Sequence, residues 1–136
     1  MEFDGIGSEQ TGWRPALVFQ NNVGNQHSPN VIALPLTSAY KKVNQPTHVF
    51  VSSRNTDLLR DSIILCENPQ RMSKKRIGNY ITTLSNDYMK KVAVANLLAT
   101  SAISFLDQDT LLDSWKRAVA LNNSESYWLH TEVSEE

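Results

Sequence analysis

Short apolar segments separated by Pro, Gly, Asn and Ser fill the first half of the chain and constrain its fold more than any other feature. They span residues 15–20, 31–36, 47–51 and 61–66. Each is too short for an ordinary helix and is rich in strand-forming residues. Segment 47–51 has the two-residue period of a half-buried strand, whereas 61–66 is apolar enough for a core strand. Pro35 predicts that the second strand lies at a sheet edge or contains a bulge.

The second half of the chain has the spacing of helices. After the capping residues Ser85-Asn86-Asp87, apolar side chains recur at helical intervals and predict a long helix that ends at about Leu106. A second helix is predicted over residues 110–121. Several strands followed by helices predict a mainly β protein with C-terminal helices, an α+β fold built on a small, strongly curved sheet or open barrel.

The remaining segments are predicted to be irregular. Residues 1–15, 21–29 and 68–76 contain the turn-forming residue types and are expected to be loops. Residues 77–84 fit either a short strand or a turn of helix. The chain after Asn122 is polar and acidic, which predicts a disordered or loosely docked arm.

Length and composition exclude several classes of protein. A chain of 136 residues with 40% apolar and 20% charged residues fits one globular domain. No apolar run reaches the ~18–20 residues that a membrane helix needs, and the first residues do not form a signal peptide. Cys66 is the single cysteine, which excludes an internal disulfide and disfavours a cysteine-based zinc site. These features predict a cytoplasmic protein without a membrane partner.

The net charge of −1 conceals an asymmetry along the chain. Residues 1–106 hold 11 Lys and Arg against 7 Asp and Glu, a charge of +4, whereas residues 107–136 hold 2 against 7, a charge of −5. A basic body favours a polyanionic partner. The acidic segment is expected either to cover the basic face or to form a helix that patches an open edge of the barrel.

A polar cluster precedes the first apolar strand and is the strongest local indication of a site. Ser8, Glu9 and Gln10 lie in a glycine-bounded loop, and Arg14 is followed directly by Pro15. Proline disfavours the helical conformation in the residue before it, so Arg14 is expected to have an extended backbone. A hydroxyl, a carboxylate, an amide and a guanidinium within seven residues are not needed by a hydrophobic core.

The motifs of the chain, taken together, resemble the MazF/PemK toxins. The resemblance runs from about Gly5 to about Leu106 and rests on five motifs in the family's order: Gly7-Ser8-Glu9-Gln10 with Gly12, Arg14 and Pro15; Gln20-Asn21 with Gly24-Asn25 and Ser28-Pro29; Leu36-Thr37-Ser38; Pro46-Thr47-His48-Val49; and Asp61-Ser62-Ile63-Ile64-Leu65. The family usually begins with a strand of the type Arg-Gly-Asp-Ile-Tyr, which this chain lacks, so one barrel edge is expected to be open.

The resemblance implies a fold, an activity and partners. It implies a barrel of the MazF, PemK and CcdB type with its C-terminal helix over residues 1–106, followed by an acidic helical extension over 107–136. The implied activity is that of a homodimeric, sequence-specific endoribonuclease, which cleaves single-stranded RNA without metal or cofactor and leaves 2′,3′-cyclic phosphate and 5′-hydroxyl ends. The implied partner is a cognate antitoxin peptide. Two alternatives remain: a catalytically inactive binding module on this fold, and a gyrase poison of the CcdB type.

The resemblance also assigns site residues. Arg14 and Thr37 correspond to the catalytic arginine and threonine, and a guanidinium suits a bidentate contact with phosphate. The RNA-binding set comprises Ser8, Glu9, Gln10, Asn21, His27, Ser38 and Arg71, the last displaced by one residue from the family pattern.

Each assignment has a structural alternative. Arg14 could instead form an ion pair with Glu9, Asn21 could bond to local backbone groups, and Trp13 could be a core residue rather than a base-stacking one. The histidines His27, His48 and His130 have no spacing that would form a metal site or a catalytic pair.

Overall fold

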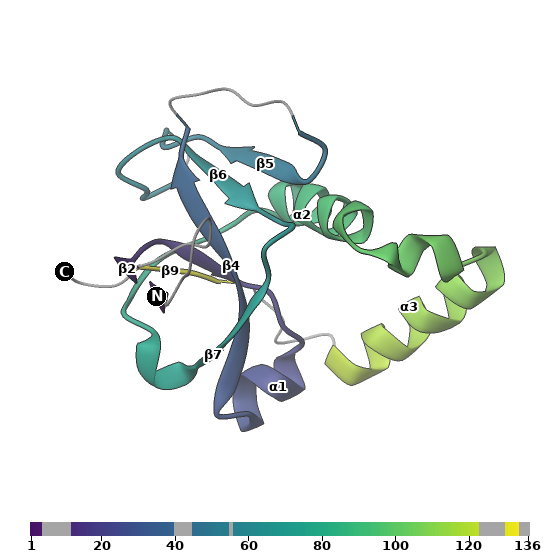
Figure 1. Ribbon diagram of the computed structural model, residues 1–136. Coiled ribbons are helices and arrows are strands. Elements are labelled where there is room, and N and C mark those ends of the chain that lie inside the picture. Colours follow the sequence, from purple (N-terminus) through teal and green to yellow (C-terminus); the bar gives the residue numbers. More distant parts are fainter. Residues whose placement is uncertain (4–11, 40–44, 55, 123–129, 134–136) are drawn as a thin grey trace.

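A computed structural model describes residues 1–3, 12–39, 45–54, 56–122 and 130–133 (Figure 1). Within these ranges a curved antiparallel sheet is followed by two helices. The elements in chain order are β1 (Glu2–Phe3), β2 (Gly12–Trp13), β3 (Ala16–Val18), α1 (Asn22–His27), β4 (Asn30–Ser38), β5 (His48–Val51), β6 (Ser62–Leu65), β7 (Gln70–Ser73), η1 (Lys74–Arg76), β8 (Asn79–Thr83), α2 (Asn86–Ala99), η2 (Ser101–Phe105), α3 (Gln108–Asn122) and β9 (His130–Val133).

The main sheet has the strand order β5-β6-β4-β3-β9-β8, and β7 pairs with β4 beside this path. Every pairing is antiparallel. In the described ladder, β5 and β8 do not pair with each other, so the sheet stays open. This arrangement confirms the predicted α+β fold with a curved, open sheet and C-terminal helices.

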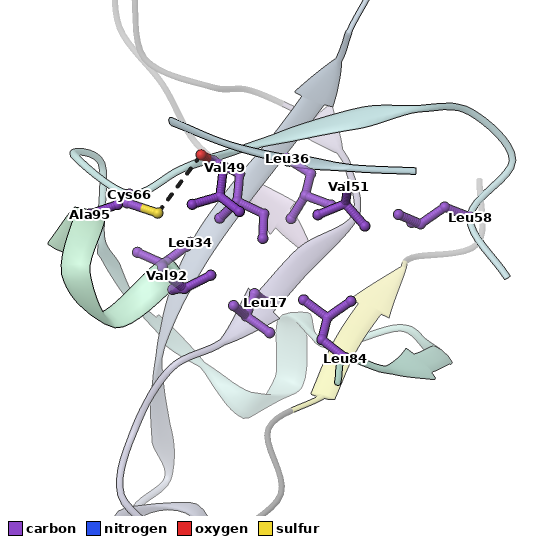
Figure 2. Close-up of a cluster of buried hydrophobic side chains, with 11 residues drawn as sticks. Leu17, Leu34, Leu36, Val49, Val51, Leu58, Cys66, Leu84, Val92 and Ala95 are labelled. Carbon is purple, nitrogen blue, oxygen red and sulfur yellow. Dashed lines mark hydrogen bonds between the residues drawn. The ribbon is translucent and has the colours of Figure 1, made fainter. Parts of the chain in front are cut away.

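Strands β3 and β4 are buried on both faces because the core lies on both sides of them. On one face Leu17, Leu34 and Leu36 pack with residues of β5, β6 and α2 in the larger cluster, which Figure 2 shows. On the other face Ala16 and Ala33 belong to a second cluster closed by β7. This explains why the sequences of these strands are continuously apolar instead of alternating.

Pro35 lies in the interior of the sheet, so the prediction that its strand is an edge was wrong. Along one side of β4 the partner changes from β7, which pairs with Asn30–Ala33, to β6, which pairs with Leu36–Ser38. Leu36 points its N–H towards β3, so the ring nitrogen of Pro35 points to the side on which the partner changes. Proline is tolerated because no ladder hydrogen bond is required there.

Three predicted loops contain regular structure. Residues 22–27 form α1, because the Asn21 side chain caps it by accepting the N–H of Gly24 at 2.9 Å. Residues 70–73 form β7, which pairs with β4 over four residues. Near the N-terminus, β1 pairs with β2, so residues 1–15 are not entirely loop. The ambiguous segment 77–84 contains a strand, β8.

The helices match the predictions except at one end. Ser85 caps α2 as predicted, but α2 ends at Ala99 and not at about Leu106, because Thr100 is extended and its side chain caps the 3₁₀ turn η2 by accepting the N–H of Ala102. The predicted second helix is α3, whose stripe of Leu111, Trp115 and Val119 is solvent-exposed.

The end of the chain does not form only a loose arm. Residues 130–133 form β9, which inserts between β3 and β8. This placement differs from the predicted alternative of a helix at an open edge, because β9 is a strand inside the sheet. The ranges 123–129 and 134–136 lie outside the described residues.

Candidate active site

The cavity that contains both predicted catalytic residues lies on the sheet and has a volume of about 650 Å³. Its walls come from residues 13–15, which lead from β2 into β3, from the end of β4, from the segment before β6, and from β8. The lining residues are Trp13, Arg14, Pro15, Leu36, Thr37, Ser38, Asp57, Leu58, Leu59, Arg60, Ser62, Asn79, Tyr80 and Ile81.

Met1 holds the backbone of Arg14 through two hydrogen bonds. Its N–H donates to the carbonyl of Met1 at 2.9 Å, and its own carbonyl accepts the Met1 ammonium at 2.7 Å. Met1 is fully buried in the second core cluster. The half-buried Arg14 therefore lines the cavity from a main chain that is fixed by Met1.

Thr37 and Ser38 end the long strand β4 on the opposite wall. Thr37 pairs in register with Ile63, and Ser38 pairs with Ser62. Both side chains are half-buried, and both line the cavity with Arg14. The structure thus brings together the two predicted catalytic residues, Arg14 and Thr37, with one predicted RNA-binding residue, Ser38.

The segment before β6 forms a third wall and is anchored by Asp61. One oxygen of its carboxylate accepts the N–H of Ser53 at 2.8 Å and the Ser53 hydroxyl at 2.9 Å. These hydrogen bonds, that from the Ser53 backbone first, hold the pKa of the Asp61 carboxyl below its usual value. Ser62 donates its hydroxyl to the Arg60 carbonyl at 2.9 Å, so Arg60 is fixed at the cavity.

Several lining residues were missed by the sequence analysis. Arg60 immediately precedes a predicted strand, as Arg14 does, and that position was a usable signal. Asp57 lies in the preceding turn, and Tyr80 lies in a segment whose structure was ambiguous. Nothing local in the sequence indicates that Asn79 and Tyr80 lie near Arg14, because β9 connects their strands.

The other predicted site residues are not at this cavity. Asn21 caps α1 through a local backbone contact, the alternative considered for it. His27 and Arg71 are exposed on α1 and β7 and do not line the cavity. His48 contacts Glu67, with 3.1 Å between Nε2 and Oε1.

The predicted residues Ser8, Glu9 and Gln10 lie outside the described part of the chain, and so does any ion pair between Glu9 and Arg14. Their roles in RNA binding therefore stay predictions, as do those of Asn21, His27 and Arg71.

The cavity is suited to an anion with an attached ring or chain. Arg14 and Arg60 supply two guanidinium groups, Thr37 and Ser38 supply hydroxyl groups, and Asp57 is the one carboxylate among the described lining residues. Guanidinium groups bind phosphate oxygens in a bidentate geometry, and hydroxyl groups can donate a further hydrogen bond. In the described ranges, no three His, Cys, Asp or Glu residues lie close enough to hold a metal ion.

None of the helices in the described residues is long and apolar enough to span a membrane. Fold and cavity together define a small antiparallel β protein with an arginine- and hydroxyl-lined cavity on its sheet.

Comparison with known proteins identifies the family. Residues 1–98 match the model of PemK-like, MazF-like toxins of type II toxin-antitoxin systems. Endoribonuclease EndoA of Bacillus subtilis (strain 168) is 39% identical over 100 residues, which are 74% of this chain and 86% of that protein. The chain therefore belongs to the PemK-like, MazF-like toxin family. Residues 99–136 lie outside the family match.

Solved structures show the same fold. The Mycobacterium tuberculosis toxin MazF-mt6 superposes with a TM-score of 0.57 at 26% identity, over 69% of this chain and 88% of that one. A mycobacterial endoribonuclease in complex with its cognate antitoxin superposes with a TM-score of 0.56 at 23% identity, over 69% of this chain and 84% of that one.

Proposed function

We propose that this chain is an endoribonuclease toxin that cleaves single-stranded RNA at the cavity between Arg14 and Thr37. The observation that carries the proposal is that both residues line one cavity, where the neighbouring Leu36 N–H donates to the Pro15 carbonyl. The name of the relative EndoA supports the same activity.

The proposed reaction uses the substrate's own 2′-hydroxyl as nucleophile and leaves the chain's side chains unmodified. The 2′-oxygen attacks the adjacent phosphorus and loses its proton, and the bond to the 5′-oxygen breaks as that oxygen gains a proton. The products are a 2′,3′-cyclic phosphate and a 5′-hydroxyl. No water, oxidant or metal enters this balance.

Arg14 stabilises the negative charge that accumulates on the non-bridging phosphate oxygens in the transition state. A guanidinium group donates hydrogen bonds and has no acceptor atom, so Arg14 is a poor general base. Thr37 donates its hydroxyl hydrogen to the same phosphate. Two carboxylates are candidates for accepting the 2′-hydroxyl proton: Asp57, which lines the cavity, and Glu9, which lies outside the described residues.

The experiment is cleavage of a long RNA by the purified chain in EDTA, followed by mapping of both ends. Cyclic-phosphate and 5′-hydroxyl ends that are absent with Arg14→Ala protein are expected. Asp57→Asn and Glu9→Gln, each assayed across pH, identify the base by loss of the acidic limb of the rate profile. RNA binding without cleavage would instead indicate the inactive binding module, and activity lost on chelation would contradict the metal-free reaction.

We further propose a cognate antitoxin and a homodimer. A second cavity, lined among others by Phe50, Tyr88, Lys91 and Val94, combines apolar surface with lysine side chains, which suits an acidic amphipathic peptide. Phe50 and Val94 are 48% and 58% exposed, so apolar surface is available for a partner. Size-exclusion chromatography with light scattering tests whether the chain forms a homodimer. Co-purification of the chain with an acidic amphipathic peptide tests whether it binds an antitoxin.

A further inference from the structure

Tyr80 has an unusual position in β8. The pairing of β8 with β9 shifts its register at Ile81, since Tyr80 pairs with Glu132 and Thr82 pairs with Thr131. In a regular strand, residues three apart point to opposite faces. The additional residue reverses that alternation, and bulges of this kind commonly re-aim side chains beside active sites.

The consequence of the bulge is a hydrogen bond between side chains three residues apart. The hydroxyl of Tyr80 lies 2.6 Å from the Thr83 hydroxyl. This contact holds the outer end of the phenol ring, while the residue stays 56% exposed and lines the cavity. A large aromatic ring is thus restrained at the edge of an anion site instead of buried in a core.

The sheet places this ring beside Arg14. Glu132 of β9 pairs with Tyr80 on one side and with Ala16 on the other, so Tyr80 lies two strands from Ala16 in the same row. Strands are spaced ~4.8 Å apart, which puts the two backbones ~10 Å apart. Arg14 is two residues before Ala16, and it lines the same cavity as Tyr80. A phosphate at Arg14 therefore leaves an attached nucleoside within reach of the Tyr80 ring.

We infer that the Tyr80 ring is a stacking platform for one base of a single-stranded RNA held at Arg14, an inference that rests on the proposed function. Unpaired bases present flat aromatic faces, and proteins that read single strands stack them on exposed aromatic side chains. Tyr80 contributes to substrate affinity and positioning, and it takes no proton and forms no bond. The Thr83 hydroxyl is a positioning group for the ring.

The test compares four full-length proteins, the wild type, Tyr80→Ala, Tyr80→Phe and Phe105→Ala. Phe105 is 80% exposed and does not line the cavity, so its variant controls for removal of an exposed aromatic ring. Substrates are one short RNA that spans a mapped cleavage site and its derivatives with a single abasic nucleotide at each position. Circular dichroism of each protein monitors folding.

Loss of one stacked base predicts that Tyr80→Ala lowers kcat/KM on the intact RNA about 10-fold, mainly through KM. Tyr80→Phe and Phe105→Ala stay within about 3-fold of the wild type. At one abasic position the Tyr80→Ala effect disappears, because the base that it would stack is absent. An equal effect at every abasic position, a loss confined to kcat, or no effect at all would overturn the inference.

A binding measurement separates this inference from the proposed reaction. The same RNA with 2′-O-methyl groups throughout has no free nucleophile, so fluorescence anisotropy reports affinity alone. Tyr80→Ala is expected to weaken this affinity about 10-fold even if no cleavage is ever found. Cleavage by the wild type with unchanged affinity of Tyr80→Ala would reject the stacking role and leave the proposed function intact.

Discussion

Leu36 donates its backbone N–H to the carbonyl of Pro15 at 3.0 Å, and this hydrogen bond joins the chain beside Thr37 to the chain beside Arg14. Arg14 and Thr37 are far apart in sequence, but each is adjacent to one partner of this hydrogen bond. A phosphate that contacts both Arg14 and Thr37 is therefore held by two paired segments of backbone and not by mobile loops. Catalytic geometry of this kind depends on the backbone more than on side-chain flexibility.

Replacement of Arg14 tests electrostatic stabilisation at this position. Arg14→Ala is expected to lower kcat about 10²–10³-fold, the usual cost of losing one such donor. Arg14→Lys should recover only part of the loss, since lysine lacks the planar bidentate fork. The matched control is Arg71→Ala, outside the cavity, which is expected to change KM and the salt dependence but not kcat. Equal losses of kcat in both variants would contradict a specific role for Arg14.

Thr37 is tested by a variant of nearly the same shape. Thr37→Val removes the hydroxyl and keeps the branched side chain, so the sheet position next to Ile63 should be preserved. A hydrogen bond to a charged group is worth roughly 1.5–3 kcal/mol, which predicts about a 10- to 100-fold loss of kcat. Thr37→Ser should retain most of the rate. Single-turnover cleavage measures both, and a fully active Thr37→Val protein would remove Thr37 from the mechanism.

Arg14 stood out locally because it belongs to a polar cluster and precedes Pro15, whereas Thr37 was assigned through the resemblance of its motif to the family. Arg60 offered a usable signal, since it too precedes a predicted strand. Asn79 and Tyr80 offered none, because their approach to Arg14 depends on which strands pair. The insertion of β9 between β3 and β8 joins residue 132 to residues 16 and 80, and no local pattern records such a contact. The general fold needs only strand and helix propensities, whereas the complete cavity needs the strand order.

Two segments that were predicted to be loops, 21–29 and 68–76, contain regular structure for reasons that lie in their own residues. Asparagine favours turns and helix N-caps for the same reason, its side chain bonding to nearby backbone, so Asn21 was compatible with either a loop or α1. The sequence 70–73 has little apolar character, yet it pairs with β4 and buries Met72. A single buried side chain and a ladder of backbone hydrogen bonds suffice for such a strand.

The hydrogen bonds of Asp61 predict that the cavity wall that carries Arg60 loses stability at acid pH. Its folded pKa is lowered from the ordinary 3.8 by hydrogen bonds from Ser53. The stabilisation is therefore complete above about pH 4–5 and is lost as the pH falls through the lowered pKa. Urea unfolding between pH 6 and pH 2 should show a steeper loss for the wild type than for Asp61→Asn, with Ser53→Ala intermediate. If the free energy of unfolding fell equally with pH in all three proteins, Asp61 would not anchor this wall.

Cys66 predicts alkaline sensitivity of the core. It is fully buried in the larger cluster, and burial, with a smaller effect of Glu67, raises its pKa from 9.0 to about 12. The folded state keeps its proton longer than the unfolded state, so stability is lost as the pH rises from about 9 to 12. Between pH 7 and pH 10 the stability advantage of the wild type over Cys66→Ala should shrink by about 1 kcal/mol. Urea unfolding at both pH values measures this difference, and a constant advantage would contradict it.

Strand β9 joins β3 to β8 in the described ladder. Thr131 pairs with Leu17 on one side and Thr82 on the other, so its N–H faces a paired strand. Thr131→Pro removes that donor and should cost roughly 1–3 kcal/mol of stability. Because β8 carries Tyr80 and β3 follows Arg14, RNA cleavage should weaken as well, while hydrogen exchange in Asn79–Thr83 rises. Thr131→Val keeps the N–H and serves as the control. If both variants exchange and cleave like the wild type, β9 does not hold the two walls of the cavity together.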